Sequence, residues 1–335
     1  MNIEKGVSVI LCCYNSSKRI EQTLYALAAQ ELHSSVPWEI VLIDNASTDH
    51  TAEFVQSLWK GLNNKITLRI VYEPKQGLAN ARTKGIKEAT YSYLVFCDDD
   101  NWLSPTYLQQ VYRILDNDPG IAACGGIGIP VFETTKPNWF DEYQEAFALG
   151  SQELNAEDGK LLNLYGAGLG VNKTAIEKLE RTNFIPFMQG RVGNKLSSSE
   201  DTELTYALVL LGYKLHYSPD LQFFHYLPKE RLTFEYLKKL FVSFGNDGPV
   251  RNLYYSMISD RFFHKRTRNW NFHLLLSLIR LVKYGIIPPK KYGRTIYFNW
   301  NIAYIKELLS IRTSYPVLKQ NILQIKSRAA GIPNS

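Results

Sequence analysis

Three consecutive aspartates, Asp98, Asp99 and Asp100, follow an apolar run over residues 93–96 and the intervening Cys97. The run predicts a buried strand, so the acids lie at its C-terminal end, where open α/β sheets bind their ligands. Carboxylates packed this closely repel one another and raise each other's pKa, and a divalent cation relieves that conflict. Oxygen ligands favour Mg²⁺ or Mn²⁺, which bind phosphate groups in turn. Taken alone, the same stretch also suits a solvated acidic turn.

A second group of acids, Glu200 and Asp201, lies at the start of a helix predicted over residues 201–211. Acids at this position stabilise a helix N-terminus, and the functional alternative is a general base. Sugar transfer from a nucleotide needs one acid/base group because a metal-neutralised diphosphate leaves readily. Glycosidases instead place two carboxylates around the bond. A metal site with one distant carboxylate therefore favours transfer over hydrolysis.

Three more side chains stand where a ligand could reach them. Asp44 ends another apolar run and could accept a hydrogen bond from a base imide or ribose hydroxyl, or cap the next helix. Arg82 lies early in a predicted helix and could hold a carboxylate or phosphate through two N–H groups, or lie on the surface. His225 ends a short strand and is either a buried, hydrogen-bonded histidine or a ligand that completes a carboxylate–imidazole metal site.

The turn after the first strand excludes two common phosphate sites. Residues 12–17 contain no glycine, so the G-x-G-x-x-G loop of dinucleotide-binding proteins is absent, and so is a Walker lysine loop. Phosphate binding is then left to a metal at Asp98, Asp99 and Asp100.

Apolar runs and helical spacing predict the elements that position these residues. Strands are expected at residues 7–13, 39–44, 67–73, 93–98, 122–129 and 221–225, and helices at 19–29, 48–58, 78–89, 105–116, 173–180 and 201–211. Ser47 is the expected N-cap of the second helix. The alternation predicts an α/β fold with a mostly parallel sheet flanked by helices. Residues 130–163 are irregular and aromatic, which suits a loop that covers a substrate.

Charge divides the chain near residue 228. Residues 228–335 hold 19 Lys and Arg and five Asp and Glu, a net charge of +14, whereas residues 1–227 hold 19 and 27, a net charge of −8. We therefore expect a catalytic domain over residues 1–227 and a basic helical region over residues 228–335, with helices at 234–244, 253–264, 272–284 and 303–311. The apolar stretch 272–288 is too short to span a bilayer. It either packs on the domain or lies on an anionic membrane surface; nucleic acid has only the basicity in its favour.

The remaining composition is that of a soluble globular protein. The chain of 335 residues is 45% hydrophobic and 21% charged. Its four cysteines, Cys12, Cys13, Cys97 and Cys124, lie in or at the end of apolar runs without metal-type spacing, which predicts buried reduced thiols. The N-terminal residues do not form a secretory leader, so a cytoplasmic location is expected.

In this order the motifs resemble those of the family 2 glycosyltransferases with the GT-A fold, of the bacterial surface-polysaccharide type. The resemblance covers residues 6–231 and is carried by residues 7–15, 41–49, 77–82, 96–100 and 199–201. It implies inverting transfer from a nucleotide-diphosphate sugar, with uridine as the expected base, to a hydroxyl of a glycan or lipid-linked acceptor. It also implies Mg²⁺ or Mn²⁺ as cofactor and work at the inner membrane face.

The resemblance also implies roles for individual residues. Asp98 and Asp100 match the outer acids of the family's D-x-D motif, with Asp100 as the main metal ligand and Asp98 near ribose and metal. His225 matches a histidine that some members place on the metal. Asp201 matches the general base, and Glu200 would orient it or contact the acceptor. The other implied contacts are Tyr14, Asn15, Asp44 and Arg82 for the nucleotide, and Trp139, Gly166, Ala167 and Gly168 for the sugar and acceptor pocket.

Two other classes of protein compete with this interpretation. A sugar-1-phosphate nucleotidyltransferase also binds a metal–nucleotide on a similar sheet, but it needs a glycine-rich basic loop after the first strand, which residues 15–18 do not supply. A non-catalytic protein that binds nucleotide sugars would use the basic tail as its working surface.

Overall fold

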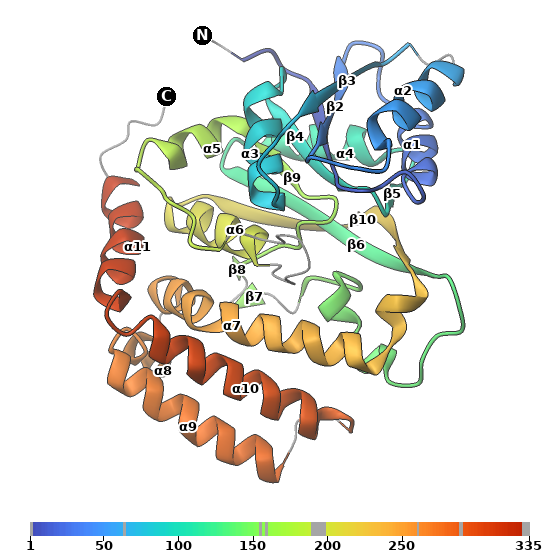
Figure 1. Cartoon of the computed structure of the whole chain (residues 1–335). Coiled ribbons are helices and arrows are strands. Elements are labelled where there is room, and N and C mark those ends of the chain that lie inside the picture. Colours follow the sequence, from blue (N-terminus) through green and yellow to red (C-terminus); the bar gives the residue numbers. More distant parts are fainter. Residues whose placement is uncertain are drawn as a thin grey trace.

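The structure is a computed structural model that describes residues 3–62, 65–153, 156–157, 160–188, 199–259, 261–287 and 291–329. Within these residues the main sheet has eight strands in the order β3-β2-β1-β4-β9-β6-β10-β5, and a second sheet has two, β7 (Ala156–Glu157) and β8 (Lys160–Leu161). Helices cover both faces of the main sheet (Figure 1). The expected α/β architecture with a mostly parallel sheet is confirmed.

The N-terminal half of the sheet is parallel, as the alternation of strands and helices predicts. Its strands are β1 (Val7–Cys13), β2 (Trp38–Asp44), β3 (Thr67–Tyr72) and β4 (Tyr93–Asp98), and its helices are α1 (Glu21–Ala28), α2 (Thr51–Gly61) and α3 (Leu78–Glu88). Cys13 pairs with Asp44, and Cys12 pairs with Asp98 on the other side of β1. The register therefore brings the C-terminal ends of β2 and β4 to the two flanks of β1.

The second half of the sheet is mixed. Its strands are β5 (Asn101–Leu103), β6 (Ile121–Phe132), β9 (Gly170–Asn172) and β10 (Lys214–Leu227). The helices of this part are α4 (Tyr107–Asn117), α5 (Lys173–Glu180) and α6 (Glu200–Leu210). The short strand β9 runs antiparallel between β4 and β6, whereas β6 and β10 are parallel. In the part of the chain that the structure describes, three short 3₁₀ helices lie outside the sheet: η1 (Phe140–Glu142), η2 (Gln144–Phe147) and η4 (Lys229–Leu232).

Two local predictions are corrected by the structure. The strand expected at residues 221–225 is the 14-residue β10, which pairs with β6 across an irregularity between Tyr217 and Gln222. Pro219 lies within that irregularity, where a missing N–H costs no ladder hydrogen bond. Ser47 does not cap α2: the N-cap is His50, with φ 60°, and the Ser47 hydroxyl accepts from the Asn15 amide.

The C-terminal region is helical, as its composition predicts, but its helices are differently divided. They are α7 (Phe234–Ile258), α8 (Phe262–Arg266), α9 (Trp270–Ile286), α10 (Gly293–Ser310) and α11 (Tyr315–Ala329). The predicted break between residues 244 and 253 is absent, since α7 runs straight through Pro249. Gly245 and Gly248 let α10 approach closely, because a Cβ atom on Gly248 would lie 2.3 Å from the Tyr304 ring. The prediction missed α11.

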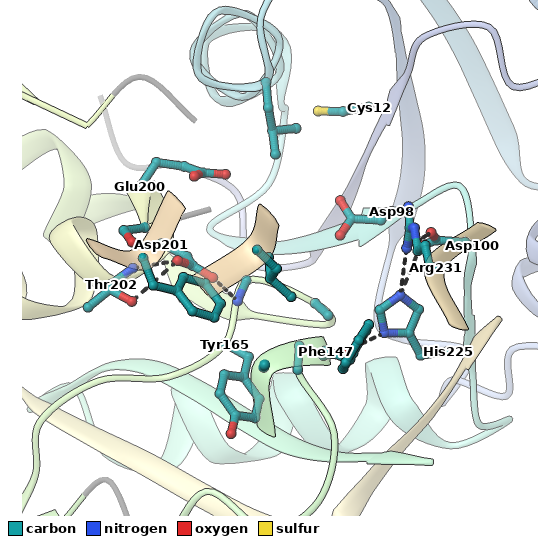
Figure 2. Close-up of a pocket in the computed structure, with 18 of the residues that line it drawn as sticks. Cys12, Asp98, Asp100, Phe147, Tyr165, Glu200, Asp201, Thr202, His225 and Arg231 are labelled. Atoms are coloured by element: carbon teal, nitrogen blue, oxygen red, sulfur yellow. Dashed lines mark hydrogen bonds and ion pairs between the residues drawn. The ribbon is translucent and has the colours of Figure 1, made fainter. Parts of the chain in front are cut away.

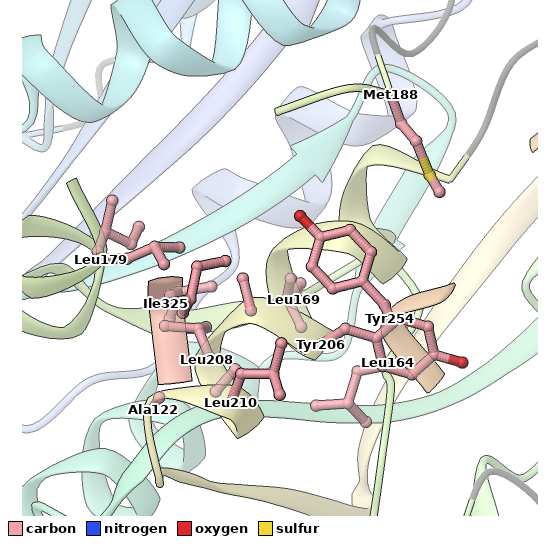
Figure 3. Packing of buried hydrophobic residues seen from close by; sticks show 14 of the residues in the cluster. Ala122, Leu164, Leu169, Leu179, Met188, Tyr206, Leu208, Leu210, Tyr254 and Ile325 are labelled. Carbon is pink, nitrogen blue, oxygen red and sulfur yellow. The ribbon is translucent and has the colours of Figure 1, made fainter. Parts of the chain in front are cut away.

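These helices pack directly against α6. Tyr206 of α6 stacks on Tyr254 of α7 with ring centroids 6.3 Å apart. Figure 3 shows Leu208 of α6 and Ile325 of α11 in the same hydrophobic cluster as these two tyrosines. That cluster also contains Ile10 of β1. The boundary expected after residue 227 thus remains a division by composition, with one core shared across it. No helix in the described ranges is long and apolar enough to cross a bilayer.

Candidate active site

A cavity of about 640 Å³ opens at the C-terminal ends of β1 and β4, a size typical of small-molecule sites. Figure 2 shows Glu200 and Asp201 in one group and Asp100, His225 and Arg231 in another, with Asp98 between them. The structure brings together most of the residues expected at the site: Tyr14, Arg82, Asp98, Asp100, Gly166, Ala167, Glu200, Asp201 and His225 line this cavity.

Two residues expected at the nucleotide, Asn15 and Asp44, are not among the lining residues. They hold neighbouring turns together instead. The Asp44 carboxylate accepts from the Ser47 amide at 3.0 Å, and Asn15, with φ 50°, accepts from the Thr48 amide at 2.8 Å. Contact between Asp44 and a nucleobase stays a prediction.

Two residues expected at the sugar pocket, Trp139 and Gly168, lie behind the lining residues. Trp139 is buried and stacks on Phe147, with ring centroids 6.3 Å apart. Gly168 has φ 69°, and a Cβ atom there would lie 2.4 Å from the Tyr107 hydroxyl. Both support the wall of the cavity through packing.

Arg82 connects the acids of the two groups. Its guanidinium lies 3.8 Å from Asp98 Oδ1 and 3.1 Å from Glu200 Oε1, and it sits over the Phe96 ring at 5.1 Å. Burial raises the pKa of Glu200 to about 7, although Arg82 opposes the shift. Burial likewise raises the pKa of Asp98, again against Arg82.

Asp99, the middle acid, is held by the protein itself. Its carboxylate pairs with Arg19 at 2.6 Å and accepts a hydrogen bond from Ser16. Its backbone carbonyl accepts from Thr23 at 3.0 Å. Asp99 therefore fixes the turn between β4 and β5.

Asp100 and His225 share a cationic partner. Arg231 Nη1 lies 2.9 Å from Asp100 Oδ2 and 3.3 Å from His225 Nε2, and that nitrogen is 3.6 Å from Asp100 Oδ1. The other imidazole nitrogen, Nδ1, lies 2.9 Å from the Phe147 carbonyl. Burial lowers the pKa of the Arg231 guanidinium, but Asp100, Tyr236 and Asp99 together raise that pKa by more.

Asp201 is fixed through both carboxylate oxygens. Oδ2 accepts from the Gly166 amide at 2.5 Å, and Oδ1 accepts from the Thr202 amide at 2.7 Å. Burial raises the pKa of Asp201, against the opposing charge of Arg82. Oδ1 also accepts from the Thr202 hydroxyl at 3.4 Å, so Oδ2 keeps the second lone pair that could accept a proton.

A family model described as glycosyl transferase family 2 matches residues 8–180, which is more than half of the chain. The chain belongs to this family. The match confirms the expectation of a family 2 glycosyltransferase. It favours a transferase over both the nucleotidyltransferase and the non-catalytic binding protein.

Curated relatives match only part of their length. The poly-beta-1,6-N-acetyl-D-glucosamine synthase of Staphylococcus aureus (strain COL) is 31% identical over 125 residues, which cover 36% of this chain and 28% of that protein. The putative glycosyltransferase EpsH of Bacillus subtilis (strain 168) is 26% identical over 119 residues, 36% of this chain and 33% of EpsH. The chain thus matches about a third or less of these relatives.

Solved structures agree with the fold over nearly the whole chain. S. aureus TarS 1-349 superposes with a TM-score of 0.51 at 16% identity and covers 98% of this chain and 93% of its own. Its UDP complex gives 0.50 at 17% identity, with coverage of 93% and 91%. The GT-A-like fold expected of the family is therefore confirmed, together with its helical C-terminal region.

The sequence did not point to several residues that complete the cavity of this family 2 glycosyltransferase. Arg231 follows His225 by six positions on η4, and Arg19 lies on the turn before α1. The C-terminal helices contribute Phe241 and Phe244 from α7 and Tyr297 from α10. No spacing rule connects these positions to the motifs, because only tertiary packing brings the tail to the ends of the strands.

The cysteines are free thiols, as predicted. Cys13, Cys97 and Cys124 are buried, and Cys12 is partly exposed and lines the cavity. Burial raises the pKa of Cys12 to about 12, so its thiol stays protonated at neutral pH.

The proposed metal donors are only partly arranged for an ion. Asp98, Asp100 and His225 supply oxygen and imidazole ligands suited to Mg²⁺ or Mn²⁺, and the Phe147 carbonyl directs His225 Nε2 towards Asp100. Across the described ranges, however, no three His, Cys, Asp or Glu side chains form a cluster that could hold a metal. The chemistry of the donors fits an ion, and Arg231 contacts two of them, Asp100 and His225.

Proposed function

We propose that this chain is an inverting glycosyltransferase that moves a sugar from a nucleotide-diphosphate donor to an acceptor hydroxyl, with Asp201 as general base. The observation that carries the proposal is one cavity at the strand ends that is lined by Asp98, Asp100 and Asp201. The D-x-D acids then serve the diphosphate side, and Asp201 serves the acceptor side.

Asp201 is suited to be the base because its carboxylate cannot rotate away. The Gly166 and Thr202 amides hold its two oxygens, and burial brings its pKa upwards towards the range of an effective base. The acceptor O–H proton passes to Asp201 while the acceptor oxygen bonds to the anomeric carbon. The bond from that carbon to the diphosphate oxygen breaks, and the diphosphate leaves with the electron pair from the opposite face.

Asp98, Asp100 and His225 would hold Mg²⁺ or Mn²⁺. When bound, the ion would supply positive charge that stabilises the departing diphosphate by several kcal/mol. Arg82, buried between Asp98 and Glu200, would help to hold the nucleotide side of the cavity, and Glu200 would position Arg82 and the base beside it.

A UDP-linked donor is the first candidate. TarS is named in complexes with UDP and with UDP-GlcNAc, and another relative is named as an N-acetylglucosamine polymer synthase. Tyr14 is 40% exposed at the cavity and offers a ring on which a base could stack. Asp44 and Asn15 would complete the nucleobase site by a shift of their turns.

The acceptor we propose is a glycan or a lipid-linked hydroxyl. The active domain would lie in the cytoplasm, with the basic tail in peripheral contact with the anionic inner face of the membrane. The tail's net charge of +14 and the apolar surface of α9 support this placement.

The experiment begins with a screen of nucleotide sugars for hydrolysis that depends on Mn²⁺. With the best donor, Asp201→Asn should lower turnover by about 10²–10⁴-fold, the usual worth of general-base help, while affinity for the nucleotide with Mn²⁺ stays within about twofold. Asp220→Asn is the matched control, since it removes the same charge from an exposed position on β10. Full turnover by Asp201→Asn would refute the assignment of the base.

A further inference from the structure

Arg231 lies where a cation bound by Asp100 and His225 would lie. One nitrogen, Nη1, contacts both Asp100 Oδ2 at 2.9 Å and His225 Nε2 at 3.3 Å. The Arg231 and Asp100 side chains are only 19% and 6% exposed, so water screens this contact poorly. The positive charge comes from η4, a short helix that directly follows β10.

The hydrogen bonds of His225 make its contact with Arg231 and its contact with a metal mutually exclusive. A carbonyl oxygen only accepts hydrogen bonds, so Nδ1 must carry the proton that it donates to Phe147. In the neutral imidazole, Nε2 then holds a lone pair, and the Arg231 N–H points to it. A metal ion binds through that same lone pair, so it cannot coordinate Nε2 while Arg231 Nη1 stays in place.

We propose that Arg231 is a resident cation that competes with the divalent metal for Asp100 and His225 and is released when the donor enters. The proposal rests on the metal and diphosphate sites of the proposed function. Removing the partner of a buried charge is costly, so metal alone must displace Arg231 at a penalty. A donor's diphosphate in the same cavity gives the guanidinium a new anionic partner, which a planar fork of N–H groups suits.

This exchange couples metal binding to donor binding. In the wild type, metal alone leaves Arg231 poorly paired, and a diphosphate alone draws Arg231 away from Asp100. When metal and diphosphate bind together, every charged group is paired. Loss of the Arg231 charge frees Asp100 and His225 for the metal but removes a partner of the diphosphate. The variant should therefore bind metal alone more tightly and show a weaker effect of UDP on metal affinity, and the coupling is reciprocal.

The test measures the Kd of Mn²⁺ for the full chain by EPR, with and without UDP, in the wild type and in Arg231→Gln. We expect Arg231→Gln to bind Mn²⁺ alone about tenfold more tightly and UDP to improve that affinity less, within the range of about 5- to 150-fold that is usual for coupled sites. Lys229→Gln is the matched control: it removes the same charge from an exposed position on the same short helix and should stay within about twofold of the wild type.

Suppose that the wild type binds Mn²⁺ in the presence of UDP but Arg231→Gln binds Mn²⁺ no more tightly than the wild type. This result overturns the competition and leaves the proposed function standing. Absence of Mn²⁺ binding with UDP in every chain overturns both the competition and the metal site. If Arg231→Gln does not fold, Arg231→Lys replaces it. An ammonium lacks the planar fork, so the affinity for Mn²⁺ alone should still rise, and an unchanged or lower affinity refutes the proposal.

Discussion

At the scale of single residues, the cavity holds more negative than positive charge around Arg82. Asp98 lies 3.8 Å and Glu200 3.1 Å from this one guanidinium, and Asp201 also acts on its charge. Burial raises the pKa values of the Asp98, Glu200 and Asp201 carboxyls, against the opposing charge of Arg82. An arginine cannot balance three ionised acids in a poorly solvated site, so this side of the cavity is prepared to receive further positive charge.

Gly166 gives the first residue-scale prediction. A Cβ atom at this position would lie 2.8 Å from Asp201 Oδ2 and 2.9 Å from Arg82 Nη2, so Gly166→Ala must push the carboxylate out of its place. We expect turnover to fall by about 10²-fold, the scale of loss for a displacement near 1 Å, with a smaller loss of affinity for UDP because the new Cβ also presses on Arg82. Steady-state kinetics and UDP titration together measure this separation.

Gly61→Ala provides the control for Gly166→Ala. Gly61 ends α2 and has no atom within 4 Å of an added Cβ, so this substitution should leave turnover unchanged. Equal losses in both variants, or a loss of UDP affinity that matches the loss of turnover, would contradict the role given to Gly166.

The residues that the sequence identified share one property: they lie at the ends of strands or helices whose periodicity is plain. Asp98, Asp201 and His225 were found this way. Arg231 was not, because its place beside Asp100 depends on where a 3₁₀ helix turns after a 14-residue strand. Trp139 was expected in the pocket from the family resemblance, but aromatic residues also build cores, and it packs behind Phe147.

At the scale of elements, strands and helices with regular periodicity were predicted within a few residues, as for β1 and α5. The larger errors lie at prolines. The expected helices end at residue 244 and begin again at residue 253, yet α7 continues through Pro249, because the packing of α7 on α10 and α6 outweighs the local preference. The last strand was expected only over residues 221–225, whereas β10 begins at Lys214 and accommodates Pro219 at an irregularity of pairing.

His273 connects three of the C-terminal helices. On α9, its Nδ1 lies 2.9 Å from the hydroxyl of Tyr315, the first residue of α11, and its Nε2 contacts the hydroxyl of Tyr304 on α10. Tyr315 donates its own proton to the Thr267 carbonyl at 2.6 Å. Tyr315 must therefore accept from Nδ1–H, which leaves Nε2 to accept from Tyr304. The network uses a neutral imidazole.

The second prediction is an acid sensitivity that this network gives to the fold. Burial, helped by the nearby Arg280 charge, lowers the pKa of His273 from 6.5 to about 3. Below pH 6.5 the unfolded chain takes up a proton that the folded chain refuses, so stability falls as pH falls from about 6.5 to 3, by up to about 1.4 kcal/mol per pH unit. Thermal unfolding of the wild type and His273→Gln from pH 7.5 to 4.5 measures this effect.

We expect His273→Gln to be less stable than the wild type at pH 7.5 and the difference in Tm to shrink towards pH 4.5, because glutamine does not titrate. His33→Gln, at an exposed histidine on the loop before β2, should keep a constant difference. A gap for His273→Gln that stays constant or widens on acidification would show that the imidazole is already charged in the fold.

At the scale of the whole molecule, the basic tail also carries an exposed apolar surface. Five residues on one face of α9 are between 44% and 67% exposed: Leu275, Leu278, Ile279, Val282 and Ile286. Their spacing matches the stripe of an amphipathic helix, although the face points away from the core. Phe262 and Phe263 of α8 extend the exposed apolar surface at 60% and 65% exposure.

Charge and apolar area together fit the surface of an anionic bilayer. Arg266 stacks on the Phe262 ring at 4.3 Å and Lys283 lies within the sequence of α9, so basic groups accompany the apolar residues. Each basic group near an anionic surface contributes about 1 kcal/mol, and salt screens this attraction. Apolar side chains that enter the interface add a term that salt does not remove.

The last prediction tests this attachment of the whole chain. We expect the protein to sediment with vesicles that contain anionic lipid at low salt, and the double variant Ile279→Ser with Val282→Ser to bind at least about tenfold more weakly. Burying one such side chain contributes about 1.5–3 kcal/mol, and each tenfold loss of affinity corresponds to about 1.4 kcal/mol. Val317→Ser with Leu323→Ser, two exposed positions on α11, should bind like the wild type. Equal losses in both double variants would remove α9 from the contact, and a mass that halves in solution for the α9 variant would assign its apolar face to a second copy of the chain.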